Sequence, residues 1–135
     1  SFEASVPECE AQTLNVFERG QVGFLSASAR LDATSIRTIN ALSAVVLPCV
    51  AAGLTLEVGG HTDATGTELA NEVLSQNRAD AVRQALLQRG VPAQAMTAFG
   101  FGQSQPIQDN DTPEGRTANR RTDITWFAPG ALRDP

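Results

Sequence analysis

The glycine-rich stretch at residues 59–66, Gly-Gly-His-Thr-Asp-Ala-Thr-Gly, constrains the fold of this chain more than any other feature. Apolar residues alternate before it, at Leu54, Leu56 and Val58, and this alternation predicts a strand. A run with helical periodicity, residues 68–89, follows it. A strand, a glycine-rich turn and a helix in this order place a polar site at a helix N-terminus.

The charges around this turn are unusual for a phosphate-binding loop. The turn itself carries an acid, Asp63. In the helix that follows, Arg78 falls at the centre of the apolar face, because several apolar residues lie within about 60° of it at about 100° per residue. A buried guanidinium needs a partner, and Asn71 lies on the same line two turns earlier. We therefore expect Asn71 and Arg78 to point back toward Asp63.

The other elements alternate along the chain. Helical spacing after Pro7 predicts a short first helix, and Pro48 is expected to end a second helix that Asp32 or Thr34 caps. The polar stretch 103–118 is expected to be a loop. Strands are expected at Val22 and Phe24, at residues 54–59, at 96–101 and at 122–127. The predicted fold class is α+β: a βαβαββ two-layer sandwich with helices on a mixed sheet, led by a short N-terminal helix.

Length and charge narrow the functions that are possible. A chain of 135 residues suits one domain. The net charge of −5 argues against nucleic acid and against adhesion to anionic lipid. Because no apolar run reaches about 18 residues, we expect no membrane insertion by this chain. Neither cysteine has a CxxC neighbour or a nearby histidine, so a metal site is not expected.

An ordered series of motifs carries a family resemblance. The series opens with Gly-His-Thr-Asp-x-x-Gly, then Asn71, then Leu-Ser-x-x-Arg-Ala-x-Ala-Val from Leu74. It continues through Gly90-Val91, Gly100-Phe101-Gly102, Pro106, Asn110-x-Thr112, Gly115-Arg116 and Asn119-Arg120-Arg121. The chain thus resembles, over roughly residues 20–128, the OmpA-like peptidoglycan-binding domain of the OmpA/Pal/MotB family.

The resemblance implies a function and a location. The family binds the diaminopimelate of the peptidoglycan stem peptide without covalent chemistry and without a cofactor, so no enzyme activity is expected. It implies a membrane-anchored parent protein in the Gram-negative periplasm, with the anchor outside this chain. The expected organisation is a lead-in helix at 1–19, the binding domain at 20–128 and a tail at 129–135.

The resemblance also implies a set of ligand-binding residues. They are Asp63, Arg78, Thr62, Asn71, Leu74, Ala27, Asn119 and Arg120. Ala27 stands where many relatives have an acid or amide, so a contact through the backbone would survive but one through a side chain would be lost.

Structural roles are the alternatives at these positions. Asp63 could cap the helix, Arg78 could form an ion pair with Asp63 or a loop carboxylate, and Leu74 could belong to the core. Asn119 and Arg120 could anchor the loop, and Arg121 should point to the face opposite Arg120. His61, the single histidine, is expected to be structural and hydrogen-bonded.

Two further points depend on an exported setting. Cys9 and Cys49 are then expected to form a disulfide, with two buried free thiols as the alternative. The alternative functions are a wall hydrolase and a protein-interaction domain of an envelope assembly, such as a motor or a secretion system. Against the hydrolase, the sequence has no Gly-x-Ser-x-Gly, no Cys/His pair and no HExxH.

Overall fold

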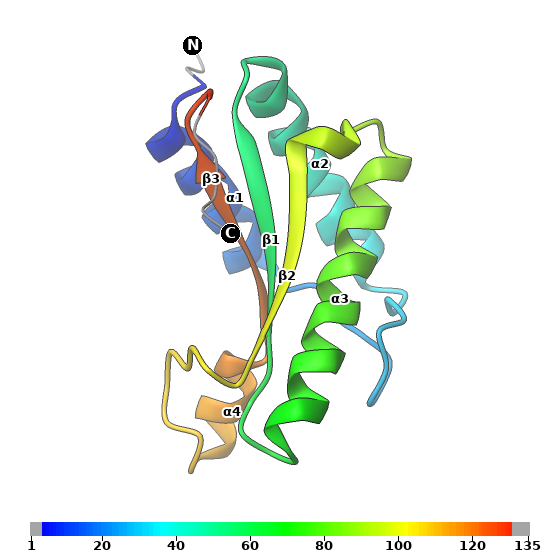
Figure 1. The fold of residues 1–135 in the computed structure, drawn as a ribbon, viewed down its shortest axis with the longest axis vertical. Helices are drawn as coiled ribbons and strands as arrows, with labels where there is room; N and C mark the ends of the chain where they lie inside the picture. Colours follow the sequence, from blue (N-terminus) through cyan, green and yellow to red (C-terminus); the bar gives the residue numbers. More distant parts are fainter. Residues whose placement is uncertain (1–3, 131–135) are drawn as a thin grey trace.

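The computed structural model describes residues 4–130 of the chain. They form a mixed sheet with three long helices packed beside it and a short helix at one end (Figure 1). This arrangement confirms the α+β class, and it confirms that a helix, α1, precedes the rest of the fold. The elements in chain order are α1 (Val6–Arg19), α2 (Ser35–Ala51), β1 (Thr55–His61), α3 (Glu68–Gln88), the 3-10 turn η1 (Ala93–Ala95), β2 (Met96–Gly102), α4 (Pro113–Asn119) and β3 (Arg121–Phe127).

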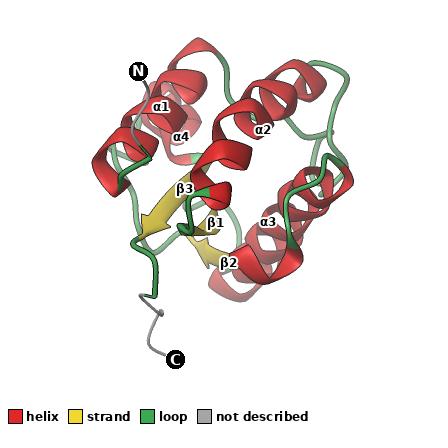
Figure 2. Cartoon of the chain, turned by 90° about the horizontal axis from the view of Figure 1, so that it is seen from above, coloured by secondary structure: helices red, strands yellow, loops and turns green. Residues whose placement is uncertain are grey.

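The sheet has β1 at its centre. The strand order is β2-β1-β3, with β1 parallel to β2 and antiparallel to β3. Seen from above, α2 lies between α1 and α3 on the same side of the sheet (Figure 2). The apolar residues of β1 pack against these helices, and this core includes Ile39, Leu42, Val46, Leu56, Val58, Val82, Leu86 and Trp126. Burial of this core fixes the carboxyl end of β1, where the glycine-rich turn begins.

The first strand expected at Val22 and Phe24 is wrong. Phe24 makes only an isolated bridge, to Leu31. A side chain takes the place of the missing strand: the Gln21 amide donates to the Thr122 carbonyl at 2.9 Å and accepts from the Thr122 N–H at 3.1 Å. One glutamine thus satisfies both backbone groups of Thr122 at the edge of β3 that a paired strand would have covered.

The loop expected at 103–118 is also wrong in part, because it contains helix α4. Thr112 caps this helix by accepting from the Gly115 N–H at 2.9 Å, and Pro113 fills the first helical position. Both are ordinary signals of a helix start. The polar composition of residues 103–118 favours a loop, and this outweighs the two helix-start signals in the prediction.

Pro48 does not end the second helix, which continues to Ala51. Proline has no N–H, so the Ala44 carbonyl loses its helical partner. Ala44 is exposed, so water can take that carbonyl. The Ala52 N–H then donates to the Pro48 carbonyl at 3.1 Å and closes the last turn.

Helix α3 protects the outer edge of β2. The Gln76 side chain donates to the Ala98 carbonyl at 3.1 Å and accepts from the Gly100 N–H at 2.8 Å. Ser75 accepts from the Gly102 N–H, and Arg83 donates to the Met96 carbonyl. These bonds occupy backbone groups that an exposed edge strand would offer to another chain.

A disulfide joins the first two helices. Cys9 of α1 and Cys49 of α2 are bonded and fully buried, which confirms the expected pairing. At the other end of α1, the Thr38 hydroxyl donates to the Gly20 carbonyl at 3.3 Å. The two helices are therefore antiparallel and fixed at both ends. Within residues 4–130, none of the helices combines the length and apolar character that a membrane span needs.

Candidate functional site

A pocket of about 320 Å³ lies at the carboxyl end of β1. Its walls come from the segment that precedes α2, from α3 and from the start of β3. Val22, Phe24, Ala27, Gly60, Arg78, Arg120 and Thr122 are among its lining residues. The turn after β1 runs beside it and ends at Thr67, whose side chain caps α3 by accepting from the Ala70 N–H at 3.1 Å.

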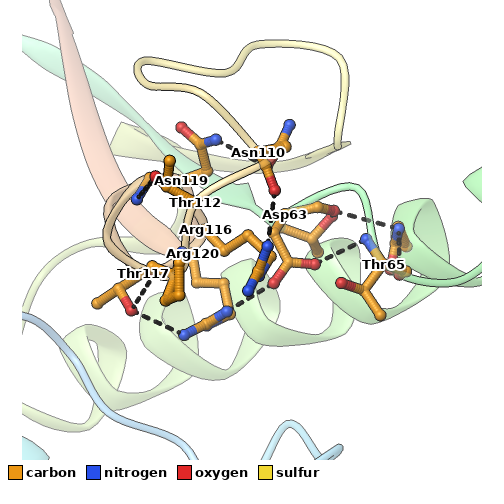
Figure 3. A network of polar contacts seen from close by, with 12 residues as sticks. Asp63, Thr65, Asn110, Thr112, Arg116, Thr117, Asn119 and Arg120 are labelled. Atoms are coloured by element: carbon orange, nitrogen blue, oxygen red, sulfur yellow. Dashed lines mark hydrogen bonds and ion pairs between the residues drawn. The ribbon is translucent and has the colours of Figure 1, made fainter.

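Asp63 lies in this turn and is 8% exposed. One carboxylate oxygen accepts from the Thr65 N–H at 2.8 Å, and the other lies 2.6 Å from Nη1 of Arg120 (Figure 3). Burial raises the pKa of Asp63, but the Thr65 N–H and the Arg120 guanidinium outweigh burial and hold that pKa below its usual range. Asp63 is therefore a fixed anion. It does not cap α3, because Thr67 is the cap and the bond from Thr65 closes a turn that precedes the helix.

Arg78 is half-buried on the face of α3 that meets the pocket. Its Nε donates to the Ser28 carbonyl at 2.8 Å, and its guanidinium carbon lies 4.8 Å from the centre of the Phe24 ring. Burial lowers the pKa of Arg78, and the nearby Arg120 charge lowers it further. The two Nη groups of Arg78 have no partner among residues 4–130, so they can meet a ligand.

The alternative of an Asp63–Arg78 ion pair is wrong for this structure. Arg120 takes the place next to Asp63, and Arg78 instead holds the segment containing Phe24 and Ser28 against α3. The sequence alone does not indicate these two partners, because its pattern places Phe24 in a strand.

Two of the predicted site residues support the turn. The Asn71 amide donates to the carbonyls of Asp63 and Thr65, at 3.3 and 3.0 Å, and to the Gln103 side chain at 2.8 Å. Thr62 is 6% exposed, and its hydroxyl donates to the Asp63 carbonyl at 2.8 Å. Both residues fix the backbone on either side of the Asp63 carboxylate.

Two further predicted residues line or border the site. Leu74 is half-buried on α3, between the core and the surface. Ala27 lies in the pocket wall, is exposed and has a φ of 54°. This left-handed conformation is unusual for a residue with a Cβ.

Asn119 holds the loop rather than facing the pocket. It is fully buried, and its side chain accepts from the N–H groups of Ile107 and Gln108 and donates to Gln108 and Asn110. Figure 3 shows it inside the loop, behind Arg120. Asn119 therefore acts on the site through the position of its neighbour Arg120.

The two adjacent arginines have different hydrogen-bond partners, although both line the pocket and Arg120 precedes the first residue of β3. Arg120 reaches Asp63, and its other terminal nitrogen donates to the Thr117 hydroxyl at 3.0 Å (Figure 3). Arg121 instead donates to the Gln105 carbonyl at 3.1 Å.

His61, which is expected to be structural and hydrogen-bonded, is buried but also lines the pocket, and its Nδ1 has no hydrogen-bond partner among residues 4–130. It is 3% exposed, its Nε2 lies 2.9 Å from a carboxylate oxygen of Asp123, and its ring stacks on Phe101. No group of three or more potential metal ligands lies within the described part of the chain.

The described residues form a small α+β domain whose pocket is lined by Arg78 and Arg120, with Asp63 bound to Arg120 beside it. The chain belongs to the OmpA family, whose sequence pattern matches residues 23–120. This match covers the turn with Asp63, the whole of α3 and the loop that leads to Arg120.

Several known proteins are similar to this chain. The peptidoglycan-binding protein ArfA of Mycobacterium bovis is 35% identical over 122 residues, which is 90% of this chain and 37% of ArfA. Outer membrane porin F of Pseudomonas fluorescens is 48% identical over 70 residues, which is 52% of this chain and 22% of the porin. The chain thus spans well under half the length of both proteins.

A solved structure supports the same fold. The peptidoglycan-associated lipoprotein of Burkholderia pseudomallei superposes with a TM-score of 0.67 at 26% identity, covering 79% of this chain and 87% of the other. The relatives are therefore bacterial envelope proteins, and two of the three have names that refer to peptidoglycan.

Proposed function

We propose that this domain binds peptidoglycan through the diaminopimelate of the stem peptide, without chemistry on the ligand. The observation that carries the proposal is a pair of opposite charges beside one pocket: the Arg78 guanidinium lines the pocket, and the Asp63 carboxylate is bound to Arg120, which also lines it. A phosphate would be repelled by Asp63, whereas a zwitterion satisfies both groups.

The free amino-acid end of diaminopimelate has the matching charges. Its ammonium would bind the Asp63 carboxylate, which has lone pairs beyond those used by Thr65 and Arg120. Its carboxylate would take two parallel N–H bonds from the Nη groups of Arg78. The Phe24 ring and the Ser28 carbonyl hold Arg78 in place before the ligand arrives. Such preorganisation lowers the entropy cost of binding.

Arg120 has a different role in this proposal. In this structure Nη1 of Arg120 lies 2.6 Å from a carboxylate oxygen of Asp63 and neutralises it. The ligand ammonium would bind at this same position. The Arg120 side chain is 46% exposed, so it can move at little cost. When the ammonium arrives, Arg120 can turn toward the ligand carboxylate and join Arg78.

The wider role follows from the family. We propose that the domain tethers a membrane-anchored parent protein to the cell wall in the periplasm. The support is the similarity to ArfA and to the peptidoglycan-associated lipoprotein, both named for peptidoglycan.

Co-sedimentation with purified sacculi of the diaminopimelate type tests the proposal. The domain should pellet with the sacculi, and the double variant Asp63→Asn/Arg78→Gln should remain in the supernatant. The matched control is Asp80→Asn/Arg37→Gln, which makes the same charge changes at exposed positions away from the pocket.

Two results would contradict the proposal. If the wild-type domain does not pellet, the domain is an interaction module rather than a wall binder. If new soluble muropeptides appear and their release requires Asp63 and Arg78, the domain is an enzyme.

A further inference from the structure

A second groove lies between α1 and α2, apart from the charged pocket. Its volume is about 430 Å³. Its apolar part is made by Val16 of α1 and by Ala41, Ala44 and Val45 of α2. A further hollow of about 760 Å³ continues it past the start of α2 and shares Arg19 and Arg37 with it.

The groove is fixed in shape. The two antiparallel helices are joined by the Cys9–Cys49 disulfide near one end, and by the Thr38 hydroxyl and the Gly20 carbonyl near the other. Ala41 and Ala44 are exposed, and their small side chains leave room for a backbone to approach α2. A groove that does not have to be ordered on binding favours affinity.

The charges in the groove lack intramolecular partners. Among the arginines of residues 4–130, only Arg19, Arg30 and Arg37 have side chains with no hydrogen bond or ion pair to the rest of the described chain. Two of these three, Arg19 and Arg37, line the same groove. This is notable in a chain with 15 acidic and 10 basic residues.

Arg37 also opposes the dipole of its own helix. It lies in the first turn of α2, where cations are unfavourable, and the acid at this helix start, Asp32, accepts from the N–H groups of Thr34 and Ser35 and does not pair with Arg37. Ile36 beside it is 58% exposed. An unfavourable charge next to an exposed apolar side chain is explained if an anionic, partly apolar partner covers both.

We propose that the α1–α2 groove binds a helical segment of a partner protein, with an apolar stripe flanked by carboxylates. The stripe packs on Val16, Ala41, Ala44 and Val45, and the carboxylates pair with Arg19 and Arg37. A helix laid against two antiparallel helices is a common mode of peptide recognition. The apolar floor favours a peptide over a simple anion or a glycan.

Three labelled peptides of about four helical turns test this proposal by fluorescence anisotropy. The first has leucine and alanine at i, i+3, i+4 and i+7 with glutamate around them. The second replaces glutamate by lysine, and the third has the composition of the first with the stripe scrambled. The full chain should bind the first peptide saturably and the other two at least about tenfold more weakly.

Variants of the chain locate the binding. Arg19→Glu/Arg37→Glu and Ala44→Trp should each weaken binding of the first peptide by about tenfold or more. Arg30→Glu is the matched control, because Arg30 is equally unpartnered but does not line the groove, and it should bind as the wild type does. Co-sedimentation of these variants with sacculi should not change.

Three outcomes would overturn the proposal. The first is equal binding of the glutamate and lysine peptides. The second is binding that is unaffected by the groove variants. The third is a dimer of this chain that Ala44→Trp dissociates, with no peptide bound, which would assign the groove to a second copy.

Discussion

At the scale of single residues, the neighbours of Asp63 keep its carboxylate ionised. Its carboxylate is almost buried, yet the Thr65 N–H and Arg120 keep its pKa below the usual range. A carboxyl with a lowered pKa in the folded state adds stability above its unfolded pKa and loses that stability as the pH falls through the lowered pKa. The ionised Asp63 carboxylate should therefore contribute fully to folding and binding at neutral pH. This contribution should be lost only in acid, when the carboxylate is protonated.

Arg120→Ala should raise the pKa of Asp63 toward its usual value of 3.8. The reason is the loss of the guanidinium at 2.6 Å. The free energy of unfolding should fall by less than about 1 kcal/mol, because Arg120 is half-exposed and its charge is screened. Carbon-13 NMR titration of the Asp63 carboxyl measures the shift, with Arg120→Lys as a control that keeps the charge. An unchanged titration would show that Arg120 does not interact with Asp63 in solution.

At the scale of elements, the disulfide fixes α1 against α2, and the close α3–β2 contact fixes α3 on the sheet. Cys9 and Cys49 are separated by 40 residues in the sequence. On the chain-entropy model, closing a loop of this length stabilises the fold by about 4 kcal/mol. The bond lies between α1 and α2, away from Asp63 and Arg78.

The double variant Cys9→Ala/Cys49→Ala should therefore lower the melting temperature by roughly 10–20 °C. Its affinity for a muropeptide should stay within about twofold of the wild type at a temperature where it is folded. Calorimetric melting and titration calorimetry on the same sample measure both. A small change in melting temperature, or two free thiols by mass spectrometry in the exported wild type, would contradict this role.

Gly100 allows α3 to lie close to β2. A methyl group there would stand 2.2 Å from the Gln76 backbone nitrogen, so α3 would have to move. Gly100→Ala should reduce the free energy of unfolding by about 3 kcal/mol, measured by denaturant titration. Gly66→Ala is the control: Gly66 has a φ of +88° but open space around it, so only about 1 kcal/mol should be lost. Equal losses would mean that the contact is not tight.

The elements also show what the sequence could and could not predict. The helix at 68–89 and the strand before it were predicted because hydrophobic period and burial agree there. The strand predicted at Val22 and Phe24 is wrong, because the Gln21 side chain bonds the N–H and carbonyl of Thr122 at the edge of β3, where that strand would have paired. Helix α4 was missed because polar composition outweighed the capping signals of Thr112 and Pro113.

The sequence indicates which charged residues lie near one another but not how they pair. The helical spacing of Arg78 agrees with its place in the pocket wall, and Asp63 lies beside that wall through its contact with Arg120. That Arg120 rather than Arg78 would meet Asp63 depends on the path of the loop 103–119, which Asn119 fixes by tertiary hydrogen bonds. Local sequence patterns do not encode such a path.

At the scale of the whole molecule, the fold presents one charged pocket beside a rigid scaffold. The sheet fixes the turn that carries Asp63, α3 carries Arg78, and the loop before β3 carries Arg120. These three elements meet only in the folded domain, so the proposed recognition of a zwitterion would depend on the whole fold. The matching sequence pattern of the OmpA family spans all three elements.

Titration calorimetry with two muropeptides tests the central claim most directly. One carries diaminopimelate and the other lysine, which keeps the amine but lacks the second carboxylate. The wild type should bind the diaminopimelate form at least about tenfold more tightly, since charge-assisted bonds contribute about 1.5–3 kcal/mol each. Arg78→Gln should remove this preference, and Asp63→Asn should weaken both ligands by about tenfold or more. Equal affinity of the wild type for the two muropeptides, or unchanged affinity in both folded variants, would contradict the account.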